Sequence, residues 1–343
     1  VGFQGKVLTP DIEALVDEGI GGVILFARNY ESPEQLRALT SGLKARAGRP
    51  FLIGVNQEGG RVQHFGAPFT RLPTMQRLGN MNSTDIAHDF GRLVGHELRG
   101  AHVDVNFAPV VDVNTNPHNP VIGDRALGSD PALVSRLGQA IVQGMQATGV
   151  AACLKHFPGH GDTHVDSHFA LPVVKLPREA LERTHFKPFQ DIVQAAAPGA
   201  VMTSHIIFTE LDAEKPATMS RIVLQGLLRE QFGFNGVVFS DSMEMKAITN
   251  DDIGIQTAMS DAANAGVDLF LVPHTRTMHR RALKALQRAV DNGVVPEERL
   301  RESFGRVDAF YERFVRSPEQ PGPAEVCMPI IAQRGFIWRF VCQ

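Results

Sequence analysis

The stretch Val150-Ala-Ala-Cys-Leu-Lys-His156 joins five consecutive apolar residues to two ionisable ones. An apolar run this continuous is typical of a strand that is buried on both faces, as in a parallel sheet. Lys155 and His156 follow at the point where such a strand ends. Because a strand of this kind needs covering layers on both faces, the stretch predicts an α/β fold built on a parallel sheet.

Similar apolar runs recur along the chain, with helical patterns between them. Runs with strand character cover residues 22–26, 51–55, 103–107 together with 110–113, 200–204, 236–240 and 267–272. An eighth strand, cut short, is expected around Val1-Gly-Phe3. Helices are expected over residues 33–46 (with Ser32 as the N-cap), 86–98, 131–145, 221–230 and 277–292. This alternation predicts either an eightfold barrel or a doubly wound sheet.

Polar residues that follow the strands favour the barrel. They stand directly after the apolar runs and are Asn56, Asp112, Lys155, His205 and Asp241. In a (β/α)8 barrel of the TIM type, the carboxyl ends of the strands form one face, and that face holds the active site. Polar turn residues are common at strand ends, but five in one chain favour a functional face. We predict a single-domain α/β barrel over residues 1–316, followed by a linker and an unassigned, irregular tail over residues 317–343.

Composition argues against several classes of protein. The 343 residues include 34 Lys+Arg and 37 Asp+Glu, a net charge of −3, so nothing indicates binding to nucleic acid or to a membrane surface. Three cysteines are too few for a disulfide framework or a four-ligand zinc site, which favours a reducing compartment. The first residues do not resemble a secretory signal. We expect a cytoplasmic monomer, and the missing initiator Met leaves open that its native start is trimmed.

The segment 155–168 has the densest chemistry in the chain. Histidines stand at every fourth position: His156, His160, His164 and His168. On a helix this spacing would suggest a metal site, but a proline and two glycines within the segment argue for a loop. Acid/base catalysis is the favoured interpretation, because Asp166 lies two residues before His168 and a carboxylate can fix an imidazole tautomer and raise its basicity. Metal binding through these histidines or Asp241 stays the alternative.

Three further segments carry candidate residues. Asp241 ends a buried strand, where an unpaired carboxylate is costly; it is a nucleophile, a metal ligand or a helix N-cap, with Glu244 as a capping-box partner. Glu58 and Arg61, separated by two glycines, bind polar ligand groups or pair with each other. Arg125 lies in a short loop and is capable of bidentate bonds. No phosphate-binding glycine loop follows a strand, so no nucleotide cofactor is implied, and we predict neither a cofactor nor a metal.

Together these segments resemble the β-N-acetylglucosaminidases of glycoside hydrolase family 3, from the first residues to about Val315. The most specific match is Lys155-His-Phe-Pro-Gly-His-Gly-Asp162 followed by Asp166-Ser-His168. It separates this branch from the family's β-glucosidases, which by the same resemblance take a carboxylate acid/base from a second domain. Further matches are Gly21-Gly-Val-Ile-Leu-Phe-Ala-Arg-Asn29, Gln57-Glu-Gly-Gly-Arg-Val-Gln63, Ala108-Pro-Val-Val-Asp-Val113, Val121-Ile-Gly-Asp-Arg125, Pro216-Ala-Thr-Met-Ser220 and Gly233-Phe-Asn-Gly-Val-Val-Phe-Ser-Asp241.

The resemblance implies a retaining double displacement on a small saccharide substrate. Asp241 matches the nucleophile that forms a covalent glycosyl-enzyme, and His168 matches the acid/base, with Asp166 as its partner. A His–Asp pair can take the role of the second carboxylate. The implied reaction removes terminal, non-reducing β-GlcNAc from muropeptides or chitooligosaccharides in the bacterial cytoplasm. The residues expected to bind the sugar are Lys155, His156, Arg125, Asn56 and Arg61.

The chain departs from the family pattern at two positions. Asn56 stands where members usually have an Asp that accepts hydrogen bonds from sugar hydroxyls, and the lost charge should weaken such bonds by roughly 1–2 kcal/mol. His64 stands where the pattern often has Arg. We therefore predict an active enzyme with weakened or altered sugar binding. Two other functions stay open: another β-glycosidase specificity within the family, or a sugar-binding protein with weakened activity.

Overall fold

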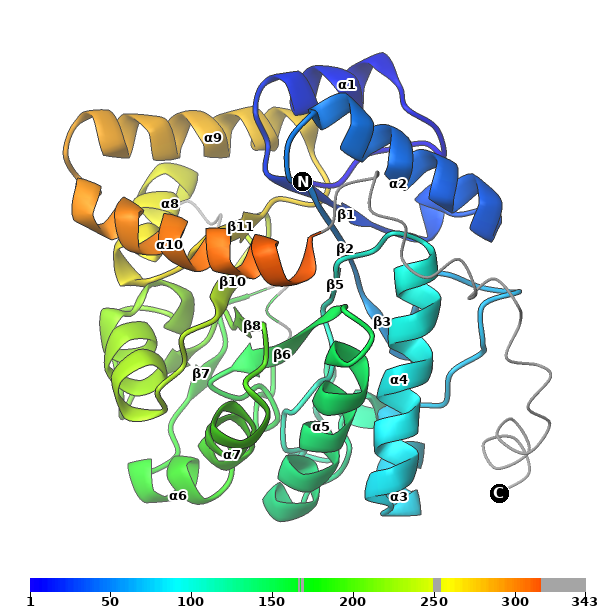
Figure 1. Cartoon of the computed structure of the whole chain (residues 1–343). Helices are drawn as coiled ribbons and strands as arrows, with labels where there is room; N and C mark the ends of the chain where they lie inside the picture. The colour runs from blue at the N-terminus through cyan, green and yellow to red at the C-terminus, as the bar shows by residue number, and fades with distance from the viewer. Residues whose placement is uncertain (166, 168–169, 249–253, 316–343) are drawn as a thin grey trace.

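A curved parallel sheet runs through the centre of the molecule and helices surround it (Figure 1). The computed structural model describes residues 1–165, 167, 170–248 and 254–315. Each of the main strands pairs in parallel with the next, in the order β1 (Gly22–Leu25), β2 (Leu52–Val55), β5 (Val105–Asn106), β6 (Ala151–Phe157), β8 (Ala200–Thr203), β10 (Val237–Ser242) and β11 (Leu269–Leu271). The predicted (β/α)8-type barrel is thereby confirmed, while the domain boundary at residue 316 stays a prediction.

The backbone of Val1 and Gly2 occupies the place of the eighth strand. The N–H of Ile24 in β1 donates to the Val1 carbonyl at 2.8 Å, and the N–H of Gly2 donates to the Val272 carbonyl, just beyond β11, at 3.4 Å. These bonds link the two edge strands of the sheet and nearly close the barrel. The expected strand segment at residues 110–113 is smaller than predicted, since it contributes one bridge, between Val110 and Lys155.

Both faces of the sheet are buried, as the apolar runs require. One set of strand side chains packs against the surrounding helices, and the alternate set fills the barrel interior. Helix α10 (Glu297–Phe314) closes the interior from the amino-terminal ends of the strands, where Phe310 and Phe314 join the inner cluster. Arg99, in the last turn of α4 (Thr84–Gly100), donates to the Phe314 carbonyl at 3.2 Å and holds the end of α10 there.

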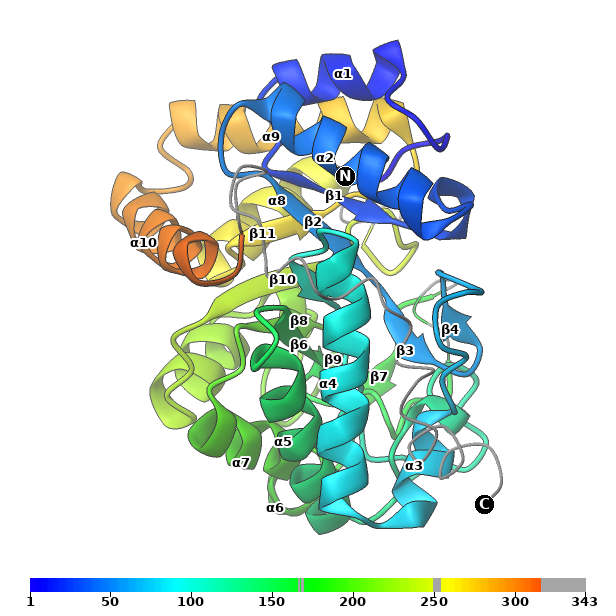
Figure 2. The same ribbon diagram turned by 45° about the vertical axis from the view of Figure 1, so that its right-hand side comes forward.

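The helices lie on the outside of the sheet (Figures 1 and 2). Ser32 caps α2 by accepting the Gln35 N–H, as predicted. The segment expected as an α-helix over residues 221–230 is instead a π-helix, η4 (Ile222–Gln231). None of the described helices is long and apolar enough to cross a bilayer. The α-helices besides α10 are α1 (Pro10–Asp17), α2 (Pro33–Ala47), α3 (Met75–Met81), α4 (Thr84–Gly100), α5 (Pro131–Gln146), α6 (Arg178–Arg183), α7 (Phe186–Ala196), α8 (Gly254–Ala265) and α9 (Arg276–Asp291).

Two short ladders lie outside the main sheet and carry loops above its carboxyl ends. β3 (Gln57–Gly59) and β4 (Val62–Gln63) form an antiparallel pair directly after β2. β7 (Val173–Val174) and β9 (Ile207–Phe208) pair in parallel and follow β6 and β8. The first ladder begins directly beyond β2, so Glu58 lies near the carboxyl end of that strand, where the site is found.

Candidate active site

Lys155 and Asp241 extend the inward-facing rows of two strands. Because strand side chains alternate between faces, a residue two positions beyond an inward residue points inward too. Each therefore reaches the carboxyl-end mouth of the barrel, the face on which TIM-type barrels carry their sites. The inward residues below them are Ala151 and Cys153 in β6, and Val237 and Phe239 in β10.

Glu58 joins two cations at this mouth. Its carboxylate accepts from Lys155 Nζ at 2.5 Å and from Arg125 Nε and Nη2 at 2.9 Å each. The side chains of Lys155 and Glu58 are each only 2% exposed, so these ion pairs are screened little by water. Burial raises the pKa of Glu58, but the charges of Lys155 and Arg125 outweigh that effect and hold it far below its usual range. Glu58 is thus an ionised partner that fixes both predicted sugar-binding cations.

Asn56 belongs to the same cluster. Its Oδ1 accepts a hydrogen bond from Lys155 Nζ at 2.7 Å. Lys155 therefore lies between one carboxylate, Glu58, and one neutral amide. The structure thus brings together three of the predicted sugar-binding residues, Asn56, Lys155 and Arg125. A fourth, His156, follows Lys155 in β6.

His156 points to a different partner. Its Nδ1 lies 2.7 Å from Oδ2 of Asp112, a carboxylate with no exposed surface. The same carboxylate accepts the backbone N–H of His160 at 2.6 Å. Burial raises the pKa of Asp112, but His156 and His160 lower it by more, so the group is ionised. The strand-end position of Asp112 had marked it as a candidate, but nothing in the sequence paired it with His156.

Asp241 is also held in its charged form. Burial raises its pKa, but His156, His205 and the Ser242 N–H, which donates to Oδ1 at 2.7 Å, lower it below the usual value. The turn that follows is not a helix, so the N-cap interpretation is wrong. Glu244 does not form a capping box either, because its carboxylate accepts the backbone N–H groups of His274 and Thr275, which follow the neighbouring strand β11.

Arg61 lies beside this cluster and does not pair with Glu58. Its guanidinium donates to Asp124 at 2.9 Å and to the Val121 carbonyl at 2.7 Å, and its side chain is half exposed. Arg61 thus braces the loop that carries Arg125. Its contact with sugar stays a prediction.

His64 and Phe26 form an edge of the mouth that the sequence analysis did not assign. Their ring centroids lie 5.2 Å apart in an edge-to-face arrangement. Burial and the Lys155 charge lower the pKa of His64 to about 4, so the ring is neutral at pH 7. Phe26 lies two positions after the inward residue Ile24, so strand alternation predicts that its side chain also points to the barrel mouth. This alternation is the one sequence signal that indicates its position.

The predicted acid/base pair, Asp166 and His168, lies outside the described residues. Ser167, between them, is described and buried, and its hydroxyl lies 3.4 Å from His160 Nε2. His160 also contacts Thr163 Oγ1 at 2.8 Å through Nδ1. β6 continues through Phe157, so the loop begins at Pro158 and not at Lys155 as predicted, and its His160 packs onto Asp112.

The alternative of a metal site finds no support among residues 1–165, 167, 170–248 and 254–315. No group of three or more histidine, cysteine or acidic side chains there is arranged to hold an ion. His156 and His160 bond to Asp112 and Thr163, while His164 is exposed and contacts Asn116 at 3.2 Å.

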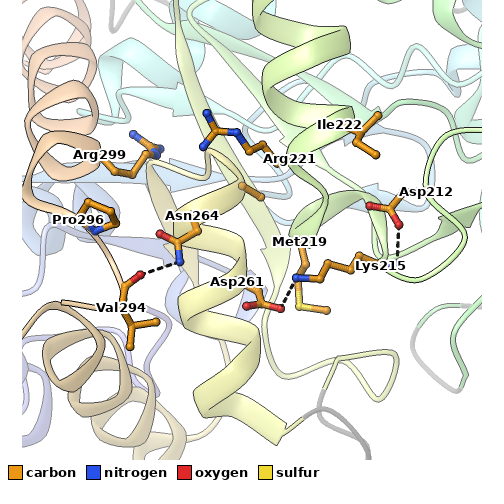
Figure 3. A pocket seen from close by; sticks show the side chains of 11 residues that line it. Asp212, Lys215, Met219, Arg221, Ile222, Asp261, Asn264, Val294, Pro296 and Arg299 are labelled. Atoms are coloured by element: carbon orange, nitrogen blue, oxygen red, sulfur yellow. Dashed lines mark hydrogen bonds and ion pairs between the residues drawn. The ribbon is translucent and has the colours of Figure 1, made fainter. Parts of the chain in front are cut away.

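A separate pocket of about 480 Å³ lies on the outside of the barrel, between η4, α8 and the start of α10 (Figure 3). Lys215 and Asp261 bridge it through an ion pair of 2.9 Å, and Asn264 donates to the Val294 carbonyl. Among the candidate residues that the structure describes, none lines this pocket.

Comparison with known proteins agrees with this geometry. The model of the glycosyl hydrolase family 3 N-terminal domain matches residues 5–309. A β-hexosaminidase of Thiobacillus denitrificans is 44% identical over 76% of this chain and 74% of its own length. A β-hexosaminidase of Tolumonas auensis is 38% identical over 88% of this chain and 94% of its own length.

Solved structures give the same family. A family 3 β-N-acetylglucosaminidase from Paenibacillus sp. FPU-7 is 39% identical with a TM-score of 0.91, over 95% of this chain but 62% of that one, so this chain spans less than two thirds of it. NagZ from Neisseria gonorrhoeae, in complex with N-trifluoroacetyl-D-glucosamine, is 31% identical with a TM-score of 0.81, over 99% of this chain and 96% of that one. The fold, the charged mouth of the barrel and these matches together place the chain in glycosyl hydrolase family 3.

Proposed function

We propose that the chain is an exo-acting, retaining β-N-acetylglucosaminidase that removes terminal, non-reducing β-GlcNAc from muropeptides or chitooligosaccharides. The observation that carries the proposal is an ionised Asp241 at the barrel mouth, beside His156 and Lys155. An ionised carboxylate is what attack on an anomeric carbon requires. The names of the relatives support the choice of sugar.

In this proposal Asp241 forms the glycosyl-enzyme and His168, assisted by Asp166, first protonates the leaving oxygen and then activates water. Lys155, Arg125, His156 and Asn56 bind sugar hydroxyls. Glu58 keeps the two cations in place, because its two oxygens accept from both. No step needs a metal or a cofactor. A cytoplasmic, monomeric enzyme without nucleic-acid or membrane partners remains our expectation.

The expected product is β-GlcNAc, formed before any α-anomer. Retention follows from two displacements at the anomeric carbon, each with inversion. Proton NMR of the first seconds of aryl β-GlcNAc hydrolysis measures the anomer directly, and an aryl β-glucoside serves as the competing substrate. An α-product released first contradicts the proposal. Preference for the glucoside favours another β-glycosidase specificity, and binding without turnover favours a sugar-binding protein.

Replacing His168 by Ala is expected to reduce cleavage of a substrate with a poor leaving group by roughly 10²-fold or more, since a general acid is lost. A nitrophenyl substrate, whose leaving group needs less protonation, should lose much less. The exposed His164 on the same loop provides the control, and His164→Ala should leave both rates unchanged. Equal losses for the two substrates in His168→Ala would argue against the acid/base role.

A further inference from the structure

Asp112 accepts hydrogen bonds from three donors in one segment of the chain. The backbone N–H of His156 is shared between Oδ1 at 3.1 Å and Oδ2 at 3.2 Å, and the backbone N–H of His160 donates to Oδ1 at 2.6 Å. Oδ2 lies 2.7 Å from Nδ1 of the His156 ring. The carboxylate has no exposed surface, so water does not compete for these bonds. Asp112 thus contacts both the backbone and the ring of a residue expected to touch the substrate.

These partners determine where the His156 ring holds its proton. A carboxylate only accepts, so Nδ1 must be the protonated nitrogen. In a neutral ring Nε2 then carries the lone pair. Within the part of the chain that the structure describes, Nε2 has no hydrogen-bond partner, and the ring lies close enough to Asp241 to interact with it electrostatically. Nε2 is therefore available to a ligand at the barrel mouth.

We propose that Asp112 is a positioning residue that keeps His156 in the Nδ1–H tautomer, so that Nε2 accepts a hydrogen bond from a sugar hydroxyl. The identity of the sugar rests on the proposed function, but the tautomer does not. Lys155 and Arg125 only donate hydrogen bonds. His156 adds an acceptor beside them. A sugar hydroxyl needs such an acceptor in order to donate a hydrogen bond.

The variant Asp112→Asn separates this role from a merely structural one. The His160 N–H can only donate and bonds Oδ1 alone, so it selects the amide oxygen at the Oδ1 position, where the His156 N–H can keep its bond as well. The amide NH2 then occupies the Oδ2 position and donates to Nδ1 of His156. The ring proton must move to Nε2, which turns the acceptor into a donor while the volume of residue 112 stays the same. A comparable Asp→Asn change in serine proteases keeps the geometry but imposes the wrong tautomer.

The experiment compares aryl β-GlcNAc with its 3-, 4- and 6-deoxy analogues. Asp112→Asn is expected to reduce kcat/KM for the parent substrate by about 10- to 100-fold, the effect of one mismatched buried hydrogen bond. The analogue that lacks the hydroxyl bound by Nε2 should lose little, because it has no proton to donate. Asp162→Asn, the same substitution on the same loop with its side chain bonded to Thr115, is the control and should change neither rate.

A second measurement does not depend on turnover. Nitrogen NMR of the wild-type protein should show His156 protonated on Nδ1 only, and Asp112→Asn should move the proton to Nε2. Equal losses for all four substrates, or a wild-type ring protonated on Nε2, would overturn the proposal. If Asp112→Asn does not fold, the wild-type spectrum still decides. If wild type cleaves no β-GlcNAc substrate but carries the Nδ1 proton, the function fails while the tautomer stands.

Discussion

Asp241→Ala is expected to reduce kcat/KM for an aryl β-GlcNAc by roughly 10⁴–10⁶-fold, the scale on which enzymes lose activity without their nucleophile. The reason is the removal of an ionised carboxylate at the mouth of the barrel, where no other group of the described site is placed to form the glycosyl-enzyme. The variant should fold, because Asp241 lies at a strand end and its carboxylate accepts a hydrogen bond from the adjacent Ser242 N–H. Initial rates with a nitrophenyl substrate measure the loss.

Azide distinguishes a lost nucleophile from a disturbed site. Added azide should enter the space of the missing carboxylate, restore cleavage of the nitrophenyl substrate and give the α-glycosyl azide. Asp261→Asn, which only breaks the half-exposed pair with Lys215 in the outer pocket, is the control and should keep wild-type rates. Near-normal turnover by Asp241→Ala would remove Asp241 from the reaction and with it the proposed mechanism.

Glu58→Gln is expected to lower the free energy of unfolding by about 3–5 kcal/mol at pH 7, the usual effect of removing one partner from a buried ion pair. The substitution leaves Lys155 and Arg125 side by side without their shared carboxylate. Activity should fall as well, since both cations lose the group that holds them. Urea unfolding followed by circular dichroism measures the stability, and sugar turnover on the folded fraction measures the activity.

The stability difference between wild type and Glu58→Gln should depend on pH in one direction. The folded-state pKa of Glu58 lies below its unfolded value of about 4.5, so its contribution is present above that pH and is lost as the pH falls below it. Glu31→Gln, which breaks an exposed pair with Lys6, is the control and should leave the unfolding midpoint unchanged. A difference that stays constant from pH 7 to pH 3 would mean that folding leaves the pKa of Glu58 unchanged, and a difference that shrinks as the pH rises from about 4.5 to 7 would mean that Glu58 is neutral in the folded protein.

The barrel could be predicted from the sequence because strands buried on both faces leave a local signal. Continuous apolar runs identified each strand of the main sheet, and the polar residues behind them mark its carboxyl edge. The π-helix at Ile222–Gln231 could not be told from an α-helix, because the two differ in backbone register and share the same amphipathic pattern.

The partners within the site could not be predicted, because they depend on distances between separate strands. Arg61 and Glu58 stand three residues apart, yet Glu58 pairs with Arg125 and Lys155, which lie 67 and 97 positions further along the chain. Asp112 and His156 likewise meet only because β5 and β6 are neighbours. Residue types at strand ends thus indicate which residues are candidates for the site. Only the folded structure shows which of them contact one another.

The position of helix α10 determines where a tag or module fused after residue 315 begins. Its final turn is tied to Arg99 at the amino-terminal rim of the barrel, whereas Lys155 and Asp241 stand at the opposite rim. A tag or an additional module fused after residue 315 therefore starts on the side remote from the rim that carries Lys155 and Asp241. Such a fusion leaves that rim uncovered. A module that acts on the same sugar chain needs a linker long enough to extend along the outer wall of the barrel to that rim.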